Sequence, residues 1–176
     1  MIAEIRRAFD ETPHPGDRFL QGSFDGSEPQ EVAEAFSGFD TWAEVPAQTL
    51  DGHYTALGFL SEGGLRFFLP AYLVADLQGH LRTADPVFHL THGLADDSRS
   101  AFVNPRRYGA MTWFEYARMR LSVFAREEAA AVVGYLQYRR EADEHGIDEA
   151  AIAAALELFW NERARTAPTQ RDLAER

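Results

Sequence analysis

Cysteine and lysine are both missing from this sequence of 176 residues. Without cysteine there are no disulfide bonds, no thiol catalysis and no cysteine-ligated zinc or iron–sulfur site. All 17 basic residues are arginine, and with 28 acidic residues the formal net charge is −11. That charge repels a phosphate backbone over most of the surface, so we expect no nucleic-acid partner.

Long apolar runs are missing as well. No stretch approaches the roughly 18 apolar residues of a membrane span, and residues 1–9 lack the continuous apolar core of a signal peptide. With the absent cysteine, these features predict a soluble cytoplasmic protein without membrane contact. The bias toward arginine and alanine is typical of a GC-rich bacterial genome. Motifs of phosphate loops, dinucleotide sites, serine-hydrolase elbows and zinc proteases are absent too, so the sequence indicates no cofactor.

What the sequence does contain is the material for a helical domain. Hydrophobic residues make up 45% of the chain, which is enough for a packed core at this length. Apolar stripes with helical spacing predict a mainly α fold, a single compact domain of about six or seven helices with at most a minor β element. We expect this domain over residues 1–165 and a polar, fraying C-terminal tail over residues 166–176.

Capping residues and helix breakers place the expected helices. Ser27, Asp85, Thr112 and Asp148 are the expected N-caps, and Gly146 separates the last two helices, which we expect to pack antiparallel. Residues 50–60 fit a strand or a helix equally well, and residues 121–124 are the best candidate for a strand. The main expected helices cover about residues 2–10, 28–36, 86–94, 113–119, 127–144 and 149–162.

The densest apolar segment, residues 64–77, is expected to form the core. Pro70 interrupts it, so either one helix kinks there or a first helix ends near Leu69 and Pro70 opens a second. The second interpretation is favoured because proline at the start and Gly79 after the end follow the usual helix asymmetry. A bend at Leu69 would leave a notch bordered by Arg66. The predicted buried face consists of Leu65, Phe68, Leu69, Leu73 and Leu77.

Two groups of side chains are candidates for chemistry. Arg66, Tyr72 and Asp76 would line the notch as a ligand-binding set, because guanidinium and phenol groups offer oriented donors. His89 and His92 stand three residues apart, a spacing that suits two metal ligands on one helix face. No third ligand stands at motif spacing, so we expect no bound metal.

The order of several segments is similar to that of a known family. These segments are Trp42-x-x-Val45-Pro46, residues 59–61, residues 66–73 and residues 134–138. They resemble a family of uncharacterised bacterial proteins, a domain of unknown function with a Phe-Leu-Pro-Ala-Tyr-Leu centre, over most of residues 2–161. Ala125 departs from the pattern where a capping Ser or Thr is expected. The resemblance implies no activity.

These observations favour a non-enzymatic protein that binds another protein. A binding or regulatory role, of the kind that immunity proteins have, suits an acidic chain without a catalytic constellation, and the acidic surface would suit a basic partner. The alternative is a metal-dependent hydrolase that uses His89 and His92. A cleft around Arg66, Tyr72 or the two histidines would favour the enzyme, and a flat, exposed apolar patch would favour the binding protein.

Overall fold

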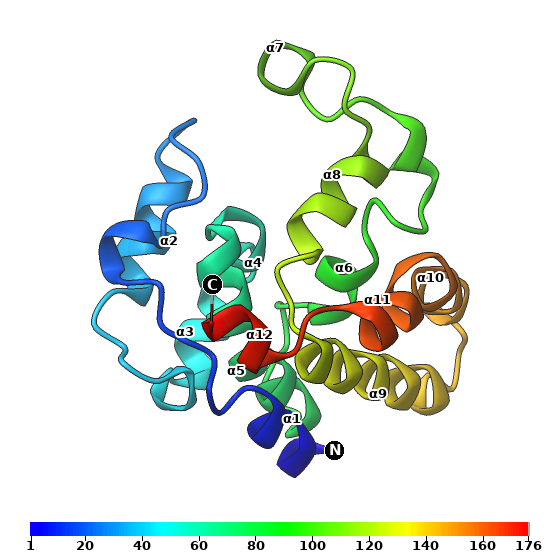
Figure 1. Ribbon diagram of the computed structural model, residues 1–176, viewed down its shortest axis with the longest axis horizontal. Coiled ribbons are helices and arrows are strands. Elements are labelled where there is room, and N and C mark those ends of the chain that lie inside the picture. Colours follow the sequence, from blue (N-terminus) through cyan, green and yellow to red (C-terminus); the bar gives the residue numbers. More distant parts are fainter. Residues whose placement is uncertain (176) are drawn as a thin grey trace. The chain divides into compact units, whose positions relative to one another are not determined.

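The computed structural model describes residues 1–175, which form α-helices, 3₁₀ turns and a π-helical segment (Figure 1). Within these residues β pairing is limited to two isolated antiparallel bridges, Gln21 with Leu60 and Phe102 with Thr112. The predicted mainly α fold class is therefore confirmed. Six helices of this part of the chain have seven or more residues, in agreement with the six or seven expected. None of the helices over residues 1–175 has the length and apolar character that a membrane crossing requires.

The chain divides into two compact units. The N-terminal unit spans Ile2–His89, and the C-terminal unit comprises Met1 and the chain from Leu90 onward. The helices of the N-terminal unit are α1 (Ile2–Ala8), η1 (Asp17–Phe19), α2 (Glu28–Phe36), η2 (Trp42–Glu44), α3 (Ala47–Gly52), α4 (Ala56–Phe59) and α5 (Glu62–Leu77). In sequence, α6 (Pro86–Thr91) crosses the boundary. The C-terminal unit continues with η3 (Asp97–Ser100), α7 (Pro105–Tyr108), α8 (Trp113–Leu121), α9 (Arg126–Ala142), α10 (Glu149–Ala155), η4 (Leu156–Trp160), α11 (Asn161–Thr166) and α12 (Gln170–Ala174).

The central helix α5 is continuous, with Pro70 inside it. The prediction that one helix ends near Leu69 and a second begins at Pro70 is therefore wrong. An interior proline costs about 3 kcal/mol because it removes one hydrogen bond and crowds the preceding turn. Every residue from Gly64 to Ala75 except Arg66 is buried, and each large apolar side chain returns about 1.5–3 kcal/mol on burial. Packing therefore outweighs the local penalty.

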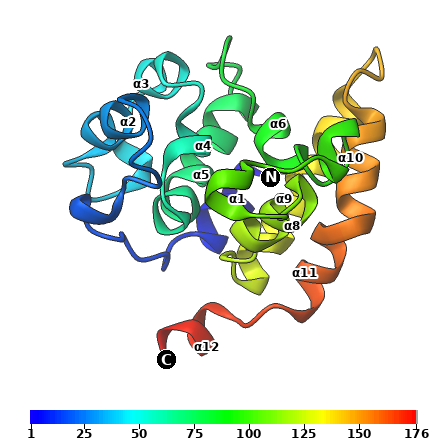
Figure 2. The same cartoon turned by 90° about the horizontal axis from the view of Figure 1, so that it is seen from above.

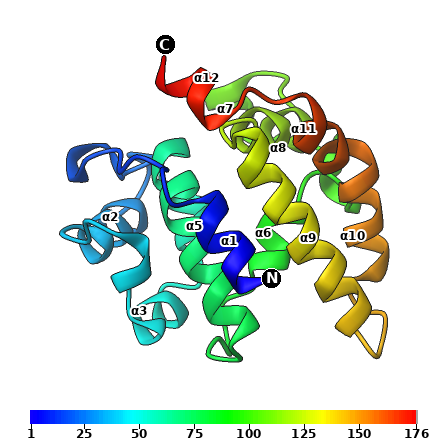
Figure 3. The same cartoon turned by 60° about the horizontal axis from the view of Figure 1, so that its bottom comes forward.

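Aromatic rings from α2 and α5 meet in the core of the N-terminal unit. Phe36 contacts Phe68 edge-on, with 4.9 Å between ring centroids, and stacks on Tyr72 at 6.3 Å. Figure 3 shows α1 lying along α5, which it contacts. The predicted buried face is confirmed at four positions, Leu65, Phe68, Leu69 and Leu73. Leu77 is only half-buried, because it is the last residue of α5.

The undecided stretch 50–60 is helical and forms the end of α3 and all of α4. Leu60 then pairs with Gln21 in an isolated bridge. A Cβ atom at the neighbouring Gly22 would lie 2.5 Å from the Leu60 carbonyl oxygen, so this close approach requires glycine. Of the apolar side chains in this loop, Leu20 is buried, whereas Phe24 is 86% exposed.

In the C-terminal unit, α9 runs beside α10, η4 and α11, and it contacts all three (Figure 3). This agrees with the predicted packing of residues 127–144 on residues 149–162. Phe159 is buried, and Val133 is half-buried. The wider π-helical turn of η4 carries Trp160, whose indole N–H donates to the carbonyl of Leu90 at 2.8 Å.

Predicted caps fall into two groups. The Asp85 carboxylate accepts the N–H of Phe88 at 3.1 Å, and Thr112 forms a reciprocal capping box with Glu115 at the start of α8. These two are confirmed. Ser27 and Asp148 stand before their helices but make no side-chain hydrogen bond to them.

The strand expected at residues 121–124 is not formed. Leu121 ends α8, and a turn leads into α9. Arg163 stabilises this turn from α11, because its guanidinium donates to the carbonyls of Ser122 and Phe124. These two carbonyls are thus paired with a side chain rather than with a neighbouring strand.

The tail from residue 166, which the sequence predicts to fray, is folded as far as residue 175. Figure 2 shows an extended link after α11 that leads into α12. The backbone N–H of Arg126 donates to Pro168 at 2.9 Å, and its Nε donates to Ala167 at 3.0 Å. The side chain of Gln170 donates to the buried carboxylate of Glu128 at 3.2 Å. The domain boundary at residue 165 stays a prediction.

Glu128 forms one half of a capping box at the start of α9. The Glu128 carboxylate accepts the backbone N–H of Ala125 at 2.7 Å. It thereby satisfies one of the amide groups that a helix N-terminus leaves without a partner. The other half, in which a Ser or Thr hydroxyl would accept an N–H of the first turn, is missing because Ala125 has no side-chain oxygen.

Candidate functional site

The predicted ligand-binding residues Arg66, Tyr72 and Asp76 lie along α5. Because α5 is continuous, Arg66 and Asp76 are about 15 Å apart along its axis. Tyr72 is 1% exposed, and its hydroxyl donates to the carbonyl of His53 at 2.9 Å. Burial also raises the pKa of the Tyr72 phenol, so the hydroxyl remains protonated. The continuous helix removes the physical basis of the notch at Arg66, and the ligand-binding role of the three residues stays a prediction.

The two histidines make separate contacts. His89 lies on α6, where its Nε2 atom is 3.2 Å from the carbonyl oxygen of Tyr54. His92 lies beyond the end of α6, and its Nδ1 atom is 2.5 Å from the Asp96 carboxylate. Across residues 1–175, no three His, Cys, Asp or Glu side chains form a group that could hold a metal ion. The hydrolase alternative therefore finds no third ligand in this part of the chain.

Asp96 holds the loop between α6 and η3 in place. Its carboxylate accepts the N–H groups of Gly93 at 3.1 Å and Ser98 at 3.0 Å in addition to its contact with His92. Burial tends to raise the pKa of Asp96, but the bonds from Ser98 and Gly93 and the nearby imidazole lower it overall. Asp96 is thus an ionised structural group that caps η3 and orients the His92 ring.

A surface rich in arginine and aromatic rings lies beside this loop. We call it the arginine–aromatic surface, and it consists of Arg99, Arg107, Tyr108, Trp113, Phe114, Tyr116 and Arg118. Two guanidinium groups lie over the half-buried ring of Phe114, with the Cζ atom of Arg99 5.7 Å and that of Arg118 5.5 Å from its centroid. Arg107 lies over Tyr108 at 5.1 Å. Rings in such contacts hold arginine head groups in place at the surface.

The rings of this surface form a connected series that ends at His92. Centroid distances are 5.3 Å from Tyr108 to Tyr116, 5.8 Å from Tyr116 to Trp113 and 4.9 Å from Trp113 to His92. All four rings are half-buried. Burial raises the pKa of Tyr108, and Tyr116 raises it further, so Tyr108 keeps its proton as a donor.

Backbone pairing positions this surface. Residues 101–103 and 111–113 run antiparallel, with hydrogen bonds from Val103 to Met111 at 3.1 Å and from Trp113 to Ala101 at 2.9 Å. The short helix α7 lies at the tip between them, beyond α8 (Figure 1). Arginines of η3 and α8 thereby reach the ring of Phe114, and an arginine of α7 reaches the ring of Tyr108, which contacts Tyr116 of α8.

The charge of this region is opposite to that of the whole chain. Residues 97–122 contain five arginines and two carboxylates, a net charge of +3, whereas the whole chain carries −11. The rest of the chain therefore carries a net charge of −14. Arg99, Arg106 and Arg118 are exposed, and none of their guanidinium groups makes an ion pair with another residue between 1 and 175.

Sequence reasoning missed this surface because its parts are separated along the chain. The adjacent Arg106, Arg107 and Tyr108 are visible as a basic–aromatic cluster. The spacing of Phe114 and Arg118, one turn apart on a helix, is a second available signal. Arg99 is distant in sequence from Phe114, and only the tertiary structure places its guanidinium over that ring.

Comparison with known proteins gives one match. No curated protein and no solved structure matches the chain. A family model matches residues 1–164, and the described tail beyond this range contains α12. The match bears out the expected membership in an uncharacterised family, while the Phe-Leu-Pro-Ala-Tyr-Leu centre as its distinctive motif stays a prediction. The chain belongs to a family of unknown function, DUF6714.

Proposed function

We propose that the chain is a non-enzymatic protein-binding protein, and that its arginine–aromatic surface binds an acidic segment of a partner protein. The observation that supports this proposal is the pair of exposed guanidinium groups, Arg99 and Arg118, held over the ring of Phe114. Guanidinium groups pair with carboxylates through two parallel hydrogen bonds. Aromatic residues and arginine are also the residue types that contribute most at protein interfaces.

Charge supports an acidic protein segment over a nucleic acid. The surface has a local net charge of +3, but the rest of the chain carries −14. A long polyanion would extend into the repulsion of the surrounding surface, whereas a short acidic segment would contact the arginines alone. The proposed partner is therefore a protein with a cluster of Asp or Glu residues beside an aromatic residue.

The titratable groups next to the surface support binding rather than catalysis. Asp96 caps η3 and orients His92. Glu115 accepts the backbone N–H and the hydroxyl of Thr112, and these bonds lower the pKa of its carboxyl group. Both carboxylates thus have structural roles, and Arg99 and Arg118 make no ion pair with them.

Fluorescence anisotropy with a labelled peptide of alternating Glu and Asp around one Tyr tests the proposal. We expect saturable binding that weakens as salt rises. Replacing Arg99 and Arg118 by Gln should weaken binding about tenfold or more, because both carboxylate partners are lost. The matched control replaces Arg140 and Arg165, exposed arginines of the same unit outside the surface, and should change binding less than about threefold.

Two results would contradict the proposal. One is equal weakening in the two double variants, which would show a diffuse charge effect. The other is tighter binding of a labelled ten-nucleotide single-stranded DNA than of the peptide, which would assign the surface to nucleic acid.

A further inference from the structure

The N-terminal unit contains an open pocket of about 380 Å³ that lies between the end of α1, the following loop, η2 and α5. Its volume falls in the range of small-molecule sites. The residues that matter for its chemistry are Arg6, Asp10, His14, Asp40, Trp42 and Phe67. This pocket is separate from the arginine–aromatic surface, which belongs to the C-terminal unit.

The walls of the pocket are fixed by internal contacts. Trp42 is buried, and its indole N–H donates to the carbonyl of Phe9 at 3.4 Å. The Thr41 hydroxyl caps η2 by accepting the N–H of Ala43. Phe67 is 3% exposed and meets the edge of the His14 ring, with 4.7 Å between centroids. These apolar groups form a preorganised floor, which lowers the cost of binding.

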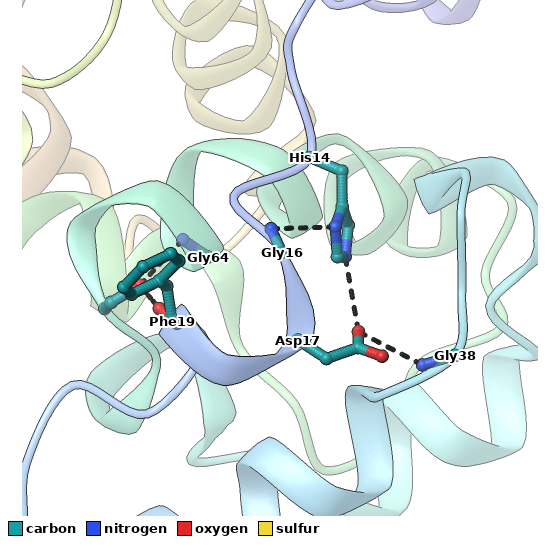
Figure 4. Close-up of polar contacts among 7 residues, drawn as sticks. His14, Gly16, Asp17, Phe19, Gly38 and Gly64 are labelled. Carbon is teal, nitrogen blue, oxygen red and sulfur yellow. Dashed lines mark hydrogen bonds and ion pairs between the residues drawn. The ribbon is translucent and has the colours of Figure 1, made fainter.

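Figure 4 shows how His14 is held in this wall. Its Nδ1 atom accepts the N–H of Gly16 at 3.0 Å, so the neutral ring carries its proton on Nε2. Nε2 is buried and lies 3.8 Å from the carboxylate of Asp17, which accepts the N–H of Gly38 at 3.3 Å. Nδ1 is therefore paired with the backbone, whereas Nε2 is buried without a hydrogen-bond partner among residues 1–175 and has only the more distant Asp17 carboxylate near it.

The charged residues of the pocket are not paired with one another. Arg6 and Asp10 stand four residues apart, a spacing that often gives an ion pair on a helix. Asp40 approaches from the segment before η2. Within residues 1–175, none of the three makes an ion pair, although all line the same pocket. The pocket thus presents one guanidinium and two carboxylates, all on exposed side chains, beside the largely buried rings of Trp42 and Phe67.

We propose that this pocket binds a small zwitterion, a free amino acid with an apolar side chain. The carboxylate of the ligand pairs with Arg6, its ammonium group pairs with Asp10 and Asp40, and its side chain rests on Trp42 and Phe67. A simple amine would leave Arg6 unpaired, and a simple carboxylate would meet two aspartates. A ligand of both signs offers a partner to all three charges.

Isothermal titration calorimetry with three related probes tests this specificity. The probes are L-leucine, leucinamide, which lacks the carboxylate, and 4-methylpentanoate, which lacks the amine. We expect saturable leucine binding below about 10 mM, and at least about tenfold weaker binding of the other two. L-phenylalanine serves as a second zwitterion with a larger side chain.

Variants show whether the binding site is this pocket. Arg6→Met should weaken leucine binding about tenfold and leave leucine no tighter than leucinamide, because the carboxylate loses its partner. Asp40→Asn should weaken leucine and leucinamide alike. Arg7→Met is the matched control, since Arg7 is an exposed neighbour on α1 that does not line the pocket. A thermal melt of each variant shows that it is folded.

The proposal is overturned if neither leucine nor phenylalanine binds, or if the three probes bind equally. It is also overturned if Arg7→Met and Arg6→Met have the same effect. Because the arginine–aromatic surface lies in the other unit, these outcomes do not bear on the proposed protein binding.

Discussion

In the N-terminal unit, buried aromatic rings contact one another around a single helix. In the C-terminal unit, buried and half-buried side chains donate hydrogen bonds to backbone carbonyls that are distant in sequence. Phe36, Phe68 and Tyr72 represent the first arrangement. Trp160, which bonds to Leu90 seventy residues away, and Arg163, which bonds to Phe124, represent the second.

The two units thus fix the positions of their loops by different kinds of contact. The helix α5 is buried on nearly every side, so apolar contact is the main interaction that fixes the segments around it, and single hydrogen bonds such as that from Tyr72 to His53 add to it. The helices α8 to α11 are less apolar, and their connecting turns contain carbonyls that need donors. Arg163 of α11 supplies the donors for the turn after α8, and Trp160 of η4 supplies a donor for the carbonyl of Leu90 in α6. Substitutions should therefore act through cavities in one unit and through unpaired carbonyls in the other.

The largest expected effect is that of Phe68→Ala in the N-terminal unit. Phe68 is fully buried and contacts the rings of Phe36 and Phe67. Its removal should lower the free energy of unfolding by about 3–5 kcal/mol, because a cavity remains among rings that cannot close it. Urea denaturation followed by circular dichroism measures this. A loss below about 1 kcal/mol would show that this core is not the rigid cluster described.

An intermediate effect is expected from Trp160→Phe in the C-terminal unit. The variant keeps an aromatic ring but leaves the buried carbonyl of Leu90 without its donor, which should cost about 1–3 kcal/mol. The matched variant is Trp42→Phe in the other unit, whose indole bond to Phe9 is longer, at 3.4 Å against 2.8 Å. Denaturation of both variants tests the comparison, and an equal or larger loss at Trp42 would contradict it.

The smallest expected effect concerns Asp51, a polar contact within the N-terminal unit. Its carboxylate accepts three backbone N–H groups, from Ala84 at 2.9 Å, Thr83 at 2.7 Å and Arg82 at 2.9 Å. These bonds lower the pKa of Asp51 in the folded state. The ionised group therefore stabilises the fold above its unfolded pKa of about 4, and this contribution is lost as pH falls through the lower folded value.

Asp51→Asn should accordingly lower the melting temperature at pH 7, and the gap to the unmodified chain should narrow as the pH falls below about 4. Thermal melts between pH 7 and pH 3 measure the gap. Asp25→Asn is the control, because the Asp25 carboxylate accepts no hydrogen bond within residues 1–175. A gap at Asp51 that is independent of pH would rule out the carboxylate as its cause.

Local signals sufficed where a helix depends on its own residues. The span of α2, the cap of α8 by Thr112 and the buried face of α5 at Phe68 and Leu69 were all predictable. Capping bonds and apolar stripes involve residues within one or two helical turns, so they can be recognised in the sequence. The same signals misjudged Pro70, because the local penalty is visible in the sequence and the packing that outweighs it is not.

The candidate sites show the same difference between information in neighbouring residues and information in the tertiary structure. The residues of the arginine–aromatic surface are visible individually, but Arg99 and Phe114 meet only through the pairing of residues 101–103 with residues 111–113. Likewise, Arg6, Asp10 and Asp40 line one pocket because α1 and η2 both pack on α5.

The sequence by itself determined a mainly α chain, most of its helix positions and the identity of its central core helix. Only the tertiary structure decided that α5 continues through Pro70, that the tail folds onto Arg126 and Glu128, and that the two histidines have different partners. The physical reason is the separation in sequence over which each interaction acts. Helix formation and capping are set by neighbours within a few residues, whereas burial, donor pairing and the meeting of charges depend on segments that are far apart in the chain.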